Sequence, residues 1–167
     1  FIKYTICIYI FLRLLSLFNR PKLIFDLEIN HAIDKLFDTS KDDGITIISA
    51  YIDFGKRYLD ELEMMLKDTI PVHILFNTQC LDDPKSKEQL DRLAKLGAEL
   101  FHNPNLHTKL YFNDHMVIST SMNFTQSSFN NSHESAVVTY EHKKYINEAW
   151  EHFDKIVESE DTIQLLP

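Results

Sequence analysis

Hydrophobic and polar residues follow two periodicities along this chain, and together they predict an α/β fold. Short apolar runs rich in β-branched residues are typical of buried strands. We predict six such strands, at residues 45–51, 72–76, 99–101, 109–112, 116–120 and 135–140. Apolar residues recur at helical spacing in four stretches, at residues 26–38, 56–68, 85–96 and 142–161. The order β–α–β–α–β is typical of layered folds with parallel strands, so we expect a mixed β-sheet sandwiched between helices.

The first 20 residues form a separate and strongly apolar segment. Lys3 and Arg13 interrupt it, and its longest uncharged run covers only residues 4–12, whereas a membrane-spanning helix needs ~20 apolar residues. We interpret residues 1–20 as an anchor or a leader, with an additional buried element as the alternative. Residues 21–167 then form one domain. An anchor would bring the protein into contact with a membrane through its N-terminus.

A long polar stretch covers residues 121–134 and contains neither Gly nor Pro. We expect it to be a loop. Polar loops of this length are uncommon in compact domains and are often functional.

The overall charge limits the classes of function that the chain can have. It carries 17 Lys and Arg against 25 Asp and Glu, a formal net charge of −8. Proteins that coat nucleic acid are usually basic, so any nucleic-acid chemistry here must come from a local site. Cys7 and Cys80 match no metal-binding spacing and indicate free thiols in a reducing compartment, which favours a cytoplasmic location.

Residues 105–139 hold most of the candidate chemistry. The polar positions that stand out are His107, Lys109, Asp114, Ser121, Asn123 and Glu134. His107 and Lys109 alternate on a predicted strand and therefore point to the same face. Cleavage of a phosphodiester requires a nucleophile, neutralisation of negative charge and a proton for the leaving oxygen.

These side chains can meet those requirements. The imidazole of His107 can act as the nucleophile, and the ammonium of Lys109 can hold a phosphate oxygen. Ser121 and Asn123 offer hydrogen-bond donors for the same phosphate. Glu134 can accept a hydrogen bond from the second ring nitrogen of His107, as the acid of a catalytic triad does.

The segment resembles the phospholipase D superfamily, whose motif is HxK(x)4D followed by GSxN and a downstream acidic residue. The resemblance is closest to short members with a single motif, which include nucleases and a cardiolipin hydrolase. One position departs from the pattern, because Thr120 stands where the family has glycine. The resemblance implies that residues 21–167 form a catalytic domain with the fold of a phospholipase D-like half-domain. It also implies that Asp114, although it belongs to the catalytic motif, has a mainly architectural role.

The same resemblance implies a homodimer. The superfamily's mechanism uses two histidines, one that attacks phosphorus and one that protonates the leaving group, and this chain carries one HxK motif. We therefore expect two copies of His107 to meet at a two-fold axis, with a phosphohistidine intermediate. Family members of this type work without a metal, so we expect no metal ion and no cofactor.

Three functions stay open at this point. The first is an endonuclease that acts on nucleic acid, the second is a cardiolipin-type phospholipid phosphodiesterase, and the third is a non-catalytic binding domain. A basic rim at the site, made by Lys56, Arg57, Lys85 or Lys87, would favour nucleic acid, whereas an apolar rim formed by the N-terminal segment would favour lipid. Seven histidines match no family position, although His115 and His133 flank the motif.

Overall fold

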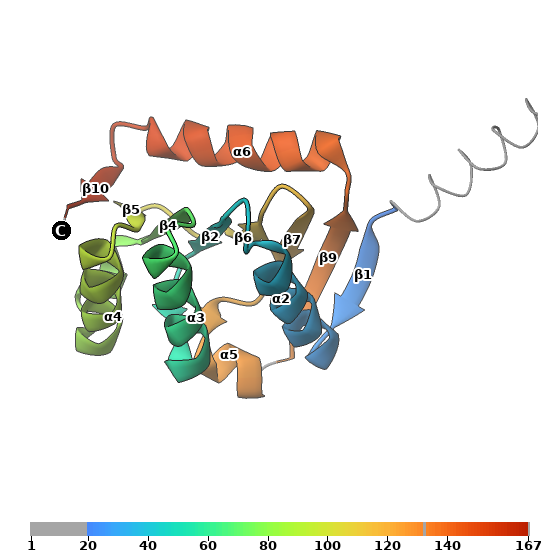
Figure 1. Ribbon diagram of the computed structural model, residues 1–167, viewed down its shortest axis with the longest axis horizontal. Coiled ribbons are helices and arrows are strands. Elements are labelled where there is room, and N and C mark those ends of the chain that lie inside the picture. Colours follow the sequence, from blue (N-terminus) through green and yellow to red (C-terminus); the bar gives the residue numbers. More distant parts are fainter. Residues whose placement is uncertain (1–19, 132, 167) are drawn as a thin grey trace, which may run out of the picture.

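The computed structural model describes residues 20–131 and 133–166, which form three layers (Figure 1). The helices are α2 (Leu27–Thr39), α3 (Gly55–Lys67), α4 (Pro84–Lys95), α5 (Gln126–Asn131) and α6 (Lys143–Val157), with a 3-10 helix η1 (Thr78–Leu81). The strands are β1 (Lys22–Phe25), β2 (Ile45–Ser49), β3 (Ile52–Asp53), β4 (Val72–Asn77), β5 (Glu99–Asn103), β6 (Lys109–Phe112), β7 (Met116–Thr120), β8 (Phe124–Thr125), β9 (Ser135–Tyr140) and β10 (Ile163–Leu165). Helices α2, α3 and α4 cover one face of the large sheet, and α6 crosses the other.

The large sheet has eight strands in the order β1-β9-β7-β6-β2-β4-β5-β10. Strands β2, β4 and β5 are parallel, as the predicted β–α–β–α–β order requires, while β6, β7, β9 and β1 continue the sheet in antiparallel pairs. The prediction of a mixed sheet between helices is confirmed.

Burial on both faces explains why the central strands are recognisable in the sequence. All five residues of β2 are buried, because α2 and α3 cover one side and α6 covers the other.

Helix α4 begins where Pro84 fixes the first turn, and the Asp83 carboxylate accepts a hydrogen bond from the Ser86 N–H at 2.8 Å. These signals fix the residue at which the helix begins, and its buried Leu90 and Leu93 hold it against the sheet.

The expected loop at residues 121–134 is only partly a loop. It contains β8, which pairs with β3 in a small parallel sheet, and the short helix α5. Phe124 and Phe129 anchor this stretch, because their rings pack against each other and against Tyr58. These apolar contacts, together with the pairing of β8 with β3, hold the polar stretch against the domain.

The apolar segment predicted at residues 1–20 lies outside the described residues except for Arg20, and Cys7 lies outside them too. Cys80 is a buried free thiol, as expected. Within the portion that the structure describes, no helix is long and apolar enough to cross a membrane.

Candidate active site

One edge of the large sheet gathers the polar ends of several strands. Strands β2 and β7 end there, while β6 and β9 begin there because they run antiparallel to those neighbours. The pairing places Ser49 opposite Lys109, and Thr120 opposite Ala136. The segments that carry the motif, residues 107–109, 121–123 and 134, therefore meet at this edge.

His107 and Lys109 are in direct contact. His107 is exposed just before β6, and the Lys109 ammonium lies 3.2 Å from both of its ring nitrogens and donates to its carbonyl oxygen at 2.8 Å. An ammonium can only donate, so any hydrogen bond in this contact runs from Lys109 to a ring nitrogen of His107. Partial burial lowers the pKa of Lys109, and the nearby Glu134 carboxylate opposes that shift.

A chain of hydrogen bonds fixes Asn123 beside Lys109. The Ser49 hydroxyl accepts from the Phe124 N–H at 2.8 Å and donates to the Tyr51 carbonyl at 2.7 Å. The Tyr51 N–H in turn donates to the side-chain oxygen of Asn123 at 3.3 Å. Because this oxygen is occupied, the amide NH₂ of Asn123 is the group left to donate to a bound phosphate.

Tyr111 supports the site from below. Its side chain is fully buried, and its hydroxyl donates to the carbonyl oxygen of Met122, the residue between Ser121 and Asn123. Burial raises the pKa of Tyr111, so the hydroxyl keeps its proton and acts as a donor.

The structure corrects the expected partner of Glu134. Its carboxylate accepts a hydrogen bond from the Ser121 hydroxyl, and its backbone N–H donates to Asp26 at 2.9 Å. Across residues 20–131 and 133–166, no hydrogen bond links Glu134 to His107. The reason is the strand order: β7 lies between β9 and β6, so Ser121 stands between Glu134 and His107.

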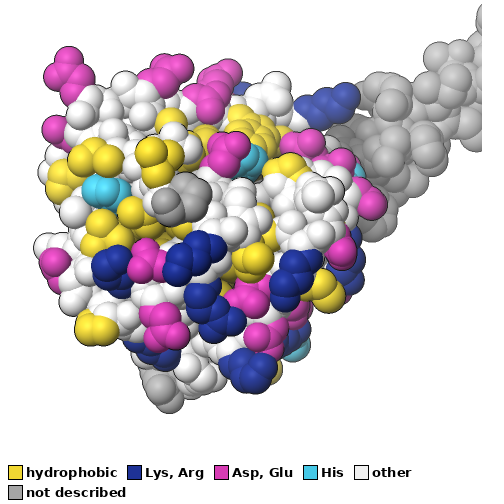
Figure 2. Space-filling model, turned by 60° about the vertical axis from the view of Figure 1, so that its left-hand side comes forward, with side chains coloured by type: hydrophobic (Ala, Val, Ile, Leu, Met, Phe, Trp, Pro, Cys, Tyr) yellow, Lys and Arg dark blue, Asp and Glu magenta, His cyan; other side chains and the backbone are white. Residues whose placement is uncertain are grey.

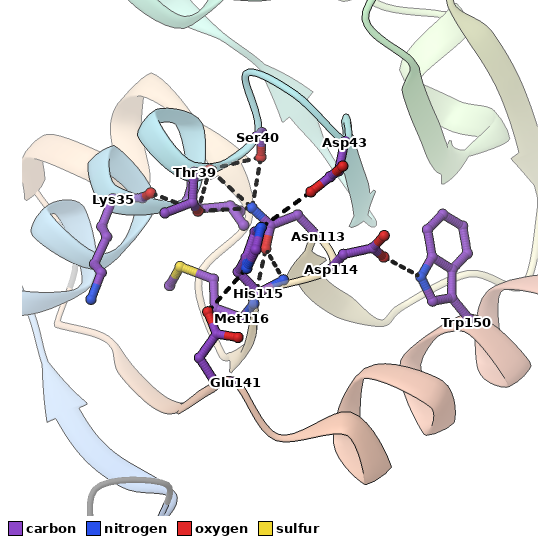
Figure 3. Close-up of polar contacts among 11 residues, drawn as sticks. Lys35, Thr39, Ser40, Asp43, Asn113, Asp114, His115, Met116, Glu141 and Trp150 are labelled. Carbon is purple, nitrogen blue, oxygen red and sulfur yellow. Dashed lines mark hydrogen bonds and ion pairs between the residues drawn. The ribbon is translucent and has the colours of Figure 1, made fainter.

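The structure does not bring Asp114 to this site. It lies in the turn between β6 and β7, at the opposite edge of the sheet, where its carboxylate accepts from the Trp150 indole N–H at 3.4 Å (Figure 3). The neighbouring Asn113, only 2% exposed, ties this turn to the end of α2 through bonds to Thr39 and Ser40. These contacts agree with an architectural place for Asp114 rather than with a catalytic one.

His115 belongs to the same turn and does not line the site. Its ring lies 3.0 Å from the Glu141 carboxylate and 3.1 Å from that of Asp43, and these contacts raise its pKa, with the Glu141 hydrogen bond as the largest cause (Figure 3). His133 lies in the segment before Glu134, exposed and 3.6 Å from Asp26.

Sequence reasoning missed Tyr51 and the cleft beside it. Tyr51 directly follows the buried run of β2, is 45% exposed and lines a cleft of about 650 Å³ together with Gln79 and Thr125. A tyrosine inside an apolar run reads as part of the strand, so only its position at the strand end could have marked it.

The cations that could form a basic rim are already paired. Lys56 contacts Asp60, Arg57 contacts Asp34 and Glu61, Lys85 contacts Asp53 and Lys87 contacts Asp91. Figure 2 shows basic and acidic side chains interleaved on the face of the molecule that carries α4. This surface therefore has no broad positive field.

Within the described ranges, no three His, Cys, Asp or Glu side chains are grouped so that they could hold a metal ion. The polar groups of this edge are one ammonium, one imidazole, one amide, one hydroxyl and the Glu134 carboxylate to which that hydroxyl donates.

Comparison with known proteins agrees with this architecture. A family model described as "Cardiolipin synthase, PLD-like domain" matches residues 33–157. A search of curated proteins found no match.

Several solved structures share the fold. Nuc from Salmonella typhimurium, a phospholipase D family member, has a TM-score of 0.75 at 19% identity, over 89% of this chain and 100% of its own. NucT from Helicobacter pylori has a TM-score of 0.70 at 17% identity, over 84% of this chain and 96% of its own. The phosphatidylserine synthase of Haemophilus influenzae has a TM-score of 0.71 at 14% identity, over 87% of this chain and 39% of its own.

Proposed function

Because this chain belongs to the phospholipase D superfamily, we propose that it is a metal-independent phosphodiesterase, with an active site shared by a homodimer and nucleic acid as its substrate. The observation that carries the proposal is the meeting of the motif residues at one sheet edge. Lys109 contacts His107 there, and Ser121 and Asn123 stand at the ends of the adjoining strands.

One chain supplies half of the required chemistry. A displacement at phosphorus through a histidine needs a second group that protonates the leaving oxygen, and the sequence has one HxK motif. In the proposed dimer, His107 of the second copy is that proton donor. Because His107 is exposed at the sheet edge, a second copy can approach it.

The proposed reaction has two steps. A ring nitrogen of one His107 attacks phosphorus, the bond from phosphorus to the leaving oxygen breaks, and the second His107 gives its proton to that oxygen. Water then gives a proton to the second imidazole while its oxygen attacks phosphorus, which releases the first histidine and a phosphate monoester. Lys109 and Asn123 hold the phosphate oxygens during both steps, while the Ser121 hydroxyl donates to Glu134 and keeps that carboxylate in place.

The surroundings of the site support nucleic acid over lipid. The cleft next to Asn123 combines the aromatic ring of Tyr51 with the hydrogen-bonding side chains of Gln79 and Thr125, a combination that suits a nucleotide base and sugar. The paired cations would give weak attraction to duplex DNA, which favours single strands or short substrates. Phospholipid stays the second candidate, because the matching family model is described as a cardiolipin synthase.

A four-substrate assay tests the proposal. Purified protein is incubated in EDTA with single-stranded DNA, RNA, duplex DNA and cardiolipin vesicles. We expect cleavage of single-stranded nucleic acid, complete loss in His107→Ala, and full activity in His31→Ala, which changes an exposed histidine on α2. Hydrolysis of cardiolipin alone would establish the lipid candidate instead, and inhibition of the wild type by EDTA would contradict the metal-independent mechanism.

A further inference from the structure

Tyr51 is an exposed aromatic side chain held in one position. Its backbone N–H donates to Asn123, its carbonyl accepts from Ser49, and its hydroxyl donates to the side-chain oxygen of Gln79 at 3.2 Å. The ring is therefore fixed at both ends, although 45% of the residue faces solvent. A large apolar ring that is both exposed and immobilised beside a phosphate site is suited to contact with a ligand.

The space next to this ring can accept more than a phosphate. The cleft has a volume of about 650 Å³, within the range of small-molecule sites. Thr125 and Ser127 bring hydroxyl groups to it, and Gln79 brings an amide NH₂ that can donate, since its oxygen already accepts from Tyr51. The cleft thus combines an aromatic face with hydrogen-bonding groups.

The charges of the cleft limit what enters it. Asp53, Asp82 and Asp83 line it, and Lys85 neutralises only Asp53, at 2.8 Å. Hydrogen bonds from Ser86 lower the pKa of Asp83, so this carboxylate is ionised at neutral pH. A further phosphate would be repelled here, whereas an uncharged base and sugar would not.

We propose that Tyr51 and this cleft form a subsite for the base and sugar of one nucleotide next to the scissile phosphate, with the base stacked on the Tyr51 ring. This proposal rests on the proposed nuclease function and narrows its substrate to an unpaired strand, because a paired base cannot lay its face on a side chain. Stacking on an aromatic side chain tolerates every base, so the subsite selects single-strandedness rather than sequence.

Dinucleoside monophosphates test the subsite, because each has a single scissile bond. The substrates are thymidylyl-thymidine and its two analogues that lack one or the other thymine. Wild-type kcat/KM should fall by about 5- to 150-fold on one analogue, the range expected for the loss of one stacked base. On the full dinucleotide, kcat/KM of Tyr51→Ala should be lower than that of the wild type by the same factor, mainly because KM rises. On the analogue that lacks the stacked thymine, Tyr51→Ala and the wild type should have the same kcat/KM.

Two control variants separate stacking from other roles. Tyr51→Phe keeps the ring and should keep most of the activity, although it loses the hydrogen bond to Gln79. Phe25→Ala removes another exposed aromatic side chain, on β1, and should change nothing. Tyr51→Ala should also elute from size exclusion as the wild type does.

The outcomes are distinguishable. If the wild type cleaves neither dinucleotides nor longer single strands, the proposed nuclease function is wrong. Three results would overturn the subsite proposal alone, provided that the wild type cleaves these substrates. They are equal activity of Tyr51→Ala and the wild type, loss of the dimer in Tyr51→Ala, and cleavage of both analogues as fast as the full dinucleotide.

Discussion

The hydroxyl of Tyr111 offers a sharp test of how the buried layer supports the site. Tyr111 is fully buried, and its hydroxyl is bonded to the carbonyl oxygen of Met122, which is itself 1% exposed. Tyr111→Phe removes that one oxygen and keeps the ring, including its edge-on contact with Phe124 at 5.1 Å between ring centroids. The substitution therefore removes the buried hydrogen bond to Met122, together with the contact between the same hydroxyl and the side chain of Ser49.

The magnitude follows from what is left behind. No ring-sized cavity forms, so the cost is that of an unsatisfied buried carbonyl, about 1–3 kcal/mol of unfolding free energy. For a domain of this size, 1 kcal/mol lowers the melting temperature by about 2–4 °C, so we expect a decrease of about 2–12 °C. Met122 also links Ser121 to Asn123, so kcat should fall as these two residues lose their fixed spacing.

Thermal and urea unfolding followed by circular dichroism measure the first effect, and phosphodiesterase assays at a temperature where both proteins are folded measure the second. Tyr140→Phe is the matched control, since no hydrogen bond from its hydroxyl occurs within the described residues. A loss under 0.5 kcal/mol in Tyr111→Phe, a range typical of neutral surface changes, would refute this account of the buried layer.

Three further predictions concern the site and the opposite edge. Mixed dimers of wild-type and His107→Ala chains should be inactive, measured on tagged heterodimers, and half of the wild-type activity would exclude a shared site. Asn113→Ala should lower the unfolding free energy, measured in urea, by about 3 kcal/mol or more. The substitution leaves the backbone N–H groups of His115 and Met116 in the same turn without their hydrogen-bond acceptor. The stability that His115 gains from Glu141 and Asp43 should be complete below pH 6.5 and lost as the pH rises through its raised folded pKa. The unfolding free energy of His115→Gln, measured in urea, should therefore differ most from that of the wild type near pH 5.5. An equal difference at pH 9 would argue against this pH-dependent stabilisation.

The sequence was sufficient to predict the centre of the fold. Strands such as β2 and β4 are buried on both faces, and burial of that kind leaves an apolar β-branched run that can be read directly. The motif was equally visible, because its residues stand at the ends of neighbouring strands and strand pairing then brings them together.

Other parts depend on contacts between distant residues. Strands β3 and β8 have two residues each, too few for any periodicity, and they exist because they pair with each other. The partner of Glu134 depends on the strand order, which places Ser121 in between. The proposed role of Tyr51 depends on Asn123, which lies more than 70 residues later in the chain and contacts the Tyr51 backbone.

Substitutions at the two ends of the hairpin of β6 and β7 should affect different properties of the protein. Its open end carries Lys109 and leads into Ser121, while its turn carries Asn113, about four residues of strand away. Random substitutions near the turn should shorten the lifetime of the protein in a cell without altering turnover per folded molecule, and those near the open end should do the reverse. A laboratory-evolution screen that scores activity in crude extract would merge these classes, so abundance must be measured alongside it before new specificities are selected from this scaffold.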